Sequence, residues 1–287
     1  MIDKTISLGR QIIYQLLALF VLGIVLFPVL WVVSMALDPR DLARPTSLVP
    51  PGASVKAFRE AIESPTPNPV SFGELARNSL AIALGVSAFT ILVGTTAAYA
   101  FSRFRFPGRQ AGMLAFVIVL MIPSTATLAA LFVMLNIVIG PTLRNSIVGV
   151  GIAMVAGSLP FAIWNMKGFI DTIPRELEEA ALIDGCNANQ TFWRIMLPLA
   201  VPGLAVTGLY GFMSGWTEFV LSWQFISNPK WFTLSMALYG MQGQYASSTP
   251  WSKFAAMSIM VSIPVVGVFF LLQRFLVSGL TAGGVKG

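Results

Sequence analysis

Six long apolar segments dominate this chain and restrict it to one kind of fold. Each is long enough to cross the hydrocarbon core of a bilayer, which takes about 20 helical residues. Their approximate positions are 12–36, 75–101, 111–136, 146–169, 199–224 and 252–275. Because lipid offers the backbone no hydrogen-bonding partner, these segments are expected to be helical. The sequence therefore predicts an all-α integral membrane protein with about six transmembrane helices in a single domain, residues 1–287.

The composition supports membrane insertion and excludes several classes of activity. Mean hydropathy is +0.78, and only 10% of the residues are charged. The chain has no histidine, which removes imidazole metal ligands and the usual general base. It also lacks the G-x-x-x-x-G-K-[ST] motif that binds ATP phosphates. We therefore expect no enzymatic activity, no catalytic residue, no metal site and no cofactor in this chain. The basic residues responsible for the net charge of +6 are expected to lie on the cytoplasmic face rather than to bind nucleic acid.

The first apolar segment resembles a signal peptide, because Lys4 and Arg10 precede it. It is, however, much longer than the 7–15 apolar residues that are typical of a signal peptide. We therefore expect this segment to be retained as a membrane span.

A short basic connection sets the expected orientation. Residues 102–109 contain three arginines and a Pro107-Gly108 turn, which is typical of a tight cytoplasmic loop. Alternation of sides then puts both termini and the connection 170–198 in the cytoplasm. The same alternation leaves two long connections on the periplasmic side, at 37–73 and 225–251.

The two outer connections differ in composition. The first is rich in proline, with a short helix expected around Val55 to Glu63, and it reads either as a passive linker or as a contact surface for an outside partner. The second mixes aromatic, amide and glycine residues at its centre. Its candidate contact residues are Tyr239, Gln242, Gly243, Gln244 and Tyr245. Such a loop can reach into a cleft, but a surface or re-entrant loop explains the same residues.

The most acidic stretch is 171–198, which holds five of the 12 acidic residues of the chain. Thr172 can cap a first helix there, and Gly185 can end it with a positive φ. Asn187 with Gln190 resembles the capping box of a second short helix, which is expected to end by Pro198. The pattern predicts a helix–turn–helix too polar to cross lipid.

The first of these helices carries a pair of small residues. Ala180 and Ala181 leave one side nearly bare, so that another protein could approach the backbone while Glu178 or Glu179 meets a basic group. A solvated loop with helical propensity explains the same residues, and the pattern alone does not decide between the two.

The spacing of this stretch resembles the EAA loop of ABC importer permeases, E-A-A-x3-G-x9-I-x-L-P. Every element of that motif is present between Glu179 and Pro198. The resemblance implies that the first short helix is a coupling helix, which sits in a cleft of a cytoplasmic ATPase, with Glu179 paired to a basic residue there. The implied coupling residues are Glu178, Glu179, Ala180, Ala181, Asp184, Gly185, Ile195, Leu197 and Pro198.

The similarity extends to the rest of the chain. Asn78-Ser79-Leu80, the stretch 97–103, the proline-rich first outer loop and the tail LTAGGVKG resemble the carbohydrate-uptake type, in particular the smaller permease subunit of maltose/maltodextrin importers. This implies the bundle of an ABC type I importer permease. It also implies that a C-terminal tail inserts between ATPase subunits, through Gly283, Gly284, Val285 and Lys286. The loop from Tyr239 to Tyr245 would enter the cleft of a sugar-binding protein and help to expel the sugar.

The resemblance further implies the partners and the location. The partners would be a second, unlike permease, two ATPase subunits that carry ATP and Mg, and an extracytoplasmic sugar-binding protein. The chain would lie in a prokaryotic cytoplasmic (inner) membrane and take part in uptake of maltose, maltodextrin or a related glucoside such as trehalose. Neither the sugar nor the residues that contact it follow from the sequence.

The fifth apolar segment contains polar residues at helical spacing. Five of them would share one face: Thr207, Gly211, Ser214, Glu218 and Ser222. Gly211 and Gly215 form a small-xxx-small pair that allows close helix packing. Glu218 is the only acid placed inside a span, which makes Ser214, Glu218 and Ser222 candidates for the translocation path. A buried structural acid is the other interpretation of Glu218, and a proton-coupled secondary transporter that uses it is the alternative function.

Overall fold

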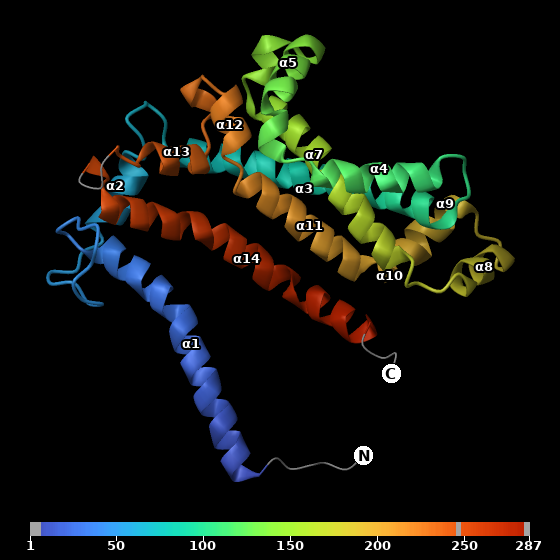
Figure 1. The fold of residues 1–287 in the computed structure, drawn as a ribbon, viewed down its shortest axis with the longest axis horizontal. Helices are drawn as coiled ribbons and strands as arrows, with labels where there is room; N and C mark the ends of the chain where they lie inside the picture. Colours follow the sequence, from blue (N-terminus) through green and yellow to red (C-terminus); the bar gives the residue numbers. More distant parts are fainter. Residues whose placement is uncertain (1–6, 245–247, 284–287) are drawn as a thin grey trace. The chain divides into compact units, whose positions relative to one another are not determined.

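The structure, a computed structural model, describes residues 7–244 and 248–283, with side chains described up to Phe275. Within these ranges every regular element is helical (Figure 1). The longer helices are α1 (Leu8–Leu37), α3 (Phe72–Arg103), α4 (Arg109–Met121), α5 (Leu128–Val138), α7 (Ile147–Ile170), α11 (Val201–Trp216) and α14 (Trp251–Gly283). The shorter elements are α2 (Lys56–Glu63), η1 (Ser124–Thr127), α6 (Gly140–Arg144), α8 (Glu176–Ile183), α9 (Ala188–Thr191), η2 (Phe192–Met196), α10 (Leu197–Leu199), α12 (Val220–Phe225), η3 (Pro229–Trp231) and α13 (Leu234–Gly240).

The all-helical membrane fold predicted from the sequence is confirmed. Helices α1, α3, α7 and the part of α14 up to Phe275 are long and apolar enough to cross a membrane. Two further candidates are bent pairs, so the described residues offer up to six spans if each pair counts as one. Helix α4 meets the η1–α5 segment at 96°, and the α9–α10 segment meets α11 at 77°.

The bends have local causes. Pro123 directly follows α4 and disfavours the helical conformation in the residue before it, and Ile122 is accordingly extended. The expected third span, 111–136, and the expected fifth span, 199–224, are therefore both wrong as single helices. Helix α11 ends at Trp216, and residues 217–219 separate it from α12.

The chain packs as two compact units. One contains the residues up to Pro67 together with Leu238–Ser262, and the other contains Asn68–Ala237 together with the residues from Ile263 onward. The single permease domain expected from the sequence stays a prediction.

In the first unit, the end of α1 packs against α2 and the first turns of α14. The small core consists of Ala36, Ala57, Ala255 and Ala256. Hydrogen bonds fix the chain after α1 to α14, because Ser252 Oγ donates to the Asp38 carbonyl at 2.7 Å and Ser252 N donates to the Asp41 carboxylate at 2.7 Å. Helix α2 confirms the short helix expected in the first outer connection.

In the second unit, α3, α7 and α11 pack along one another. The Asn78-Ser79 pair attaches the start of α3 to the connection between α12 and α13. Asn78 Nδ2 donates to the carbonyl oxygens of Lys230 and Phe232 at 2.8 and 2.9 Å, and Ser79 Oγ accepts from Leu234 N at 2.9 Å. These contacts at the start of α3 thus explain why the sequence resembles that of known permeases at Asn78-Ser79.

Two glycines bring α11 against the backbone of α3, which confirms the expected close packing. A Cβ atom added at Gly211 would lie 2.9 Å from Ser87 Cα, and one at Gly215 would lie 2.8 Å from Ala83 Cα. Ser87 Oγ also donates to the Gly208 carbonyl at 2.8 Å. Side chains at the two glycine positions would therefore force the helices apart.

We expect Gly215→Ala to lower the stability of the second unit, because the new methyl group meets backbone that cannot rotate away. Overpacking of this kind costs about 1–3 kcal/mol. The thermal unfolding midpoint of the detergent-solubilised protein measures the effect. Gly168→Ala is the matched control, since a Cβ there has no atom within 4 Å. Equal midpoints for the two variants would contradict the tight packing.

Candidate functional site

The acidic stretch after α7 forms the helix–turn–helix that was predicted, although its first helix starts later. Thr172 does not cap it: the Thr172 hydroxyl donates back to the Phe169 carbonyl at 2.7 Å, and α8 begins after Arg175. Gly185 ends α8 with φ +88°, as predicted.

The second short helix begins as expected and ends later. Asn187 and Gln190 form a capping box, with two reciprocal hydrogen bonds of 2.9 Å. The helix continues through the π-helical turn η2 and α10 to Leu199. Pro198 is therefore not its end, because it lies in the first turn of α10, where a missing N–H is tolerated.

A buried ion pair holds α8 against the end of α3. Arg103 Nε donates to Glu178, and the two side chains are only 7% and 14% exposed. The other arm of Arg103 donates to the carbonyl oxygens of Ile170 and Ile173, at 3.1 and 2.8 Å. Tyr99 Oη completes the set by donating to Glu178 at 3.0 Å. One side chain therefore joins α3, the end of α7 and α8.

A second carboxylate connects the same helices. Asp171 accepts from Ser102 Oγ and from Lys167 Nζ, both at 2.5 Å. Burial alone would raise the pKa of Asp171, but these hydrogen bonds and the nearby positive charges hold that pKa below its usual value. Asp171 therefore remains ionised at neutral pH and accepts from α3 and α7 at once.

The outer side of α8 has no partner from the described part of the chain. Glu179 and Ala180 are exposed, and Ile183 is 86% exposed. Ala181, in contrast, is 3% exposed. The prediction of a bare face is therefore wrong for Ala181. Successive residues of an α-helix are rotated by about 100° around its axis, so Ala180 and Ala181 lie on different sides.

Sequence reasoning missed the residues that hold α8. In the sequence, Arg103 indicates only the cytoplasmic side of its loop, and Asp171 is one of the five acids of the stretch 171–198. Ser102, Tyr99 and Lys167 received no role. Ion pairs between residues 75 positions apart leave no periodic pattern, so only the similarity of the stretch 97–103 to known permeases pointed to it.

Two other predicted segments are only partly described. Gln242 and Gln244 are exposed, Tyr239 lies in the last turn of α13, and Gly243 N donates to Thr249 Oγ1 at 2.9 Å. Gly283 is the last residue of α14. The remaining residues of these two predictions lie outside the described ranges: Tyr245, Gly284, Val285 and Lys286.

The three translocation-path candidates do not share one helical face. Because the helix stops at Trp216, Glu218 lies in the break and its carboxylate caps α12, accepting from Leu221 N at 2.5 Å and Ser222 N at 2.9 Å. The Ser222 hydroxyl also donates to Glu218 and is fully buried. Glu218 is 8% exposed, and both of its oxygens are used within its own segment. This geometry favours the structural interpretation of the acid.

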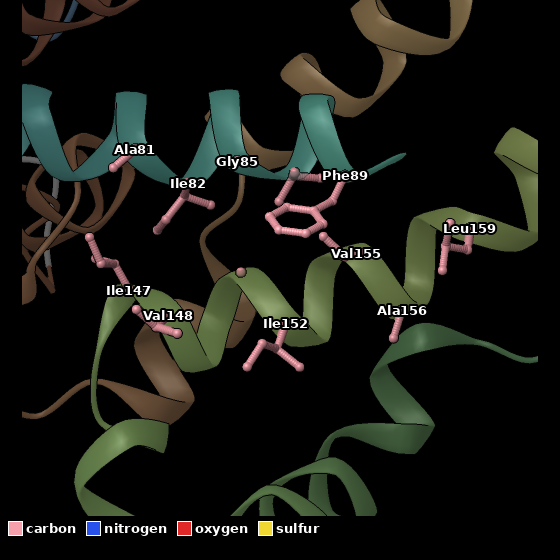
Figure 2. Close-up of a pocket in the computed structure, with 12 residues that line it drawn as sticks. Ala81, Ile82, Gly85, Phe89, Ile147, Val148, Ile152, Val155, Ala156 and Leu159 are labelled. Carbon is pink, nitrogen blue, oxygen red and sulfur yellow. The ribbon is translucent and has the colours of Figure 1, made fainter. Parts of the chain in front are cut away.

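The most apolar hollow of the second unit lies between α3 and α7 (Figure 2). It has a volume of about 580 Å³ and is lined only by apolar side chains and glycine, such as Phe89, Ile152 and Val155. No lining group can donate or accept a hydrogen bond through its side chain, so this groove cannot orient a polar substrate. Among the described residues, no three His, Cys, Asp or Glu side chains come together to hold a metal ion.

The comparisons with known proteins identify the class to which this helical bundle belongs. Residues 90–281 match the family of binding-protein-dependent transport system inner membrane components. The chain therefore belongs to that family, whose members are multi-pass membrane permeases of ABC importers. The matched segment includes the end of α3, the stretch 171–198 and both helix bends.

Individual relatives narrow the type of permease. The chain is 34% identical to the galactooligosaccharides permease protein GanQ of Bacillus subtilis, over 97% of this chain and 96% of the relative. It is 35% identical to the maltose/maltodextrin permease protein MalG of Escherichia coli, over 100% and 99%. It is 30% identical to the trehalose permease protein SugB of Mycobacterium tuberculosis, over 97% and 98%.

A solved structure agrees with the fold. A chain of a bacterial ABC transporter involved in the import of alginate superposes with a TM-score of 0.74 at 19% identity, over 94% of this chain and 98% of that chain. The type I importer permease fold expected from the EAA loop is thus confirmed.

Removal of Arg103 is expected to release α8 from the bundle. Arg103→Met leaves the Glu178 carboxylate buried without its partner, which costs about 3 kcal/mol. A lower thermal unfolding midpoint and faster proteolytic cleavage between residues 171 and 187 measure the effect. Arg105→Met is the control, because Arg105 is exposed in the same loop. Unchanged cleavage in Arg103→Met would show that the ion pair does not hold the helix.

Glu218→Gln is expected to keep substantial uptake. The amide retains one acceptor oxygen for the α12 N-terminus and loses the other, at a cost of about 1 kcal/mol. Glu218→Ala removes both acceptors and should destabilise the protein further. Uptake by membrane vesicles is the measurement. Complete loss of uptake by a normally assembled Glu218→Gln variant would instead favour a proton-coupled role for this carboxylate.

Proposed function

We propose that this chain is a membrane-spanning subunit of an ATP-driven importer for maltose, maltodextrin or a related glucoside such as trehalose. It forms half of the translocation path, and a second, unlike permease forms the other half. The names of two relatives support this substrate class, because they refer to maltose/maltodextrin and to trehalose, and the name of the third refers to another group of oligosaccharides, galactooligosaccharides. ATP and Mg are bound by two ATPase subunits, and an extracytoplasmic binding protein delivers the sugar.

The observation that carries this proposal is the position of α8. Its inner side is fixed by the Arg103–Glu178 pair, and its outer side presents Glu179 and Ala180. A rigid helix with one exposed side suits docking into a cleft of another protein. Because Arg103 also donates to the end of α7, a displacement of α8 is passed to two long helices rather than absorbed by the loop.

The transport cycle follows from this connection. Nucleotide binding closes the ATPase pair, the docked coupling helices move with it, and the bundle changes from inward-open to outward-open. This requires the nucleotide to bind the two states with different affinity, since a ligand that binds both equally shifts nothing. Sugar then enters from the binding protein, and hydrolysis resets the cycle.

The termini and the second outer connection take the positions that this role requires. Both termini lie in the cytoplasm, in accord with the arginines at 103, 105 and 109 on the same side as α8. The exposed Gln242–Gln244 segment faces the binding protein from the periplasmic side. The tail that begins at Gly283 reaches the ATPase subunits.

Charge reversal on the exposed side of α8 is expected to separate coupling from folding. Glu179→Lys should leave the thermal unfolding midpoint unchanged, because Glu179 is exposed in this chain. ATP-driven sugar uptake by the complete transporter should fall by more than about tenfold, since like charges at an interface cost several kcal/mol. Glu176→Lys, also exposed in the first turn, is the control. Normal uptake by Glu179→Lys would refute the role of this residue.

A further inference from the structure

A second hollow in the same unit differs from the apolar groove in its chemistry. It has a volume of about 430 Å³, within the range of roughly 300–1,000 Å³ that is usual for ligand pockets. Its walls come from η1, α5, α7, α11 and the break before α12. Hydroxyl groups line it from several sides: Ser124, Thr125, Thr127, Ser158, Tyr210, Ser214 and Thr217.

Two helix interruptions meet at this cavity. The first is the sharp bend after α4, which places Ser124 and Thr125 on the wall. The second is the break at 217–219, which places Thr217 and Glu218 there. Both interrupt apolar segments that were expected to cross the membrane. Non-helical backbone in such segments is tolerated where it is buried in protein or lines a water-filled cavity, and discontinuous helices form the substrate sites of many secondary transporters, another class of membrane carrier.

Three of the wall hydroxyls, those on α7 and α11, are left for an external partner. Ser158, Tyr210 and Ser214 form no hydrogen bond to any described residue. Thr217 differs, because its hydroxyl donates to the Met213 carbonyl at 2.8 Å. Tyr210 is held in place by Phe161, with ring centroids 4.2 Å apart. These three hydroxyls therefore lie on two helices, α7 and α11, that pack against each other.

The cavity offers hydroxyl groups rather than an available charge. Glu218 is the one carboxylate in the wall. Its two oxygens already accept hydrogen bonds from the backbone N–H groups of Leu221 and Ser222 and from the Ser222 hydroxyl. A cation would find no free ligand set here, and an anion would find no basic group in the wall. A neutral, hydroxyl-rich molecule can both donate to and accept from Ser and Tyr side chains.

We infer that this cavity is a contact site for the sugar in transit, in which Ser158, Tyr210 and Ser214 bind sugar hydroxyls. The inference rests on the proposed function and adds to it the residues of this chain that meet the substrate. It also assigns the path to the side of the bundle where two spans are interrupted, and away from the groove between α3 and α7.

The test uses the complete transporter in proteoliposomes, with its sister permease, ATPase and binding protein. The probes are radiolabelled maltose, maltotriose and trehalose, and the readout is the amount of sugar imported per ATP hydrolysed. Ser158→Ala, Tyr210→Phe and Ser214→Ala each delete one hydroxyl. Each should lower this ratio by about two- to tenfold, the effect of one lost hydrogen bond. Thr96→Ala is the control, because its hydroxyl is exposed and bonds to its own helix at Leu92.

A cavity-filling variant provides a stronger effect. Ser214→Leu should nearly abolish uptake while ATP hydrolysis stimulated by the binding protein continues. Met213→Leu is its neighbour control, since Met213 does not line the cavity and is 41% exposed. If Ser214→Leu fails to assemble, the three hydroxyl deletions decide the question.

The outcomes separate this inference from the proposed function. A lower import ratio in the cavity variants and a normal ratio in the controls support the inference. A wild-type ratio in all three hydroxyl deletions overturns it and leaves the sugar importer intact. Failure of the wild-type transporter to import any of the three sugars overturns the proposed function, and the inference falls with it.

Discussion

The buried pair between Arg103 and Glu178 is the interaction on which the α8 end of this permease depends. Burying two charges carries a desolvation penalty that their attraction barely offsets, so such a pair is a poor source of stability. Its value is positional. The planar guanidinium has donors in fixed directions, and here they reach a carboxylate on α8, the carbonyl of the last residue of α7 and a carbonyl just after it. An apolar contact of the same size would not fix the direction of the helix.

Local signals in the sequence predicted local structure well. Gly185 ends α8 in the left-handed conformation, and Asn187 with Gln190 forms a capping box, because both depend on a few neighbouring residues. The lengths of the apolar segments likewise predicted the candidate spans, because they too depend only on residues that are close in the sequence. Thr172 failed as a cap because its hydroxyl binds the preceding turn of α7 instead.

Features set by distant residues could not be predicted in this way. The polar residues from 207 to 222 have helical spacing, but the helix stops at Trp216 and Glu218 turns to cap the next one. Either Glu178 or Glu179 was expected to meet an external base, yet the base that Glu178 meets comes from α3 of the same chain. In both cases the sequence contained the right residues, and tertiary packing decided their partners.

The glycine contact between α3 and α11 has a mechanical consequence. Backbone lies against backbone at Gly211 and Gly215, and Ser87 fastens the same two helices at Gly208. Sliding or rolling one helix over the other would bring main-chain atoms into collision, so we expect the two helices to move as one rigid body. Deformation is then left to the places where the chain is already bent, near Pro123 and Ala200. We therefore expect any hinge of this permease to lie at these bends rather than within the α3–α11 pair, whose main chains are in close contact.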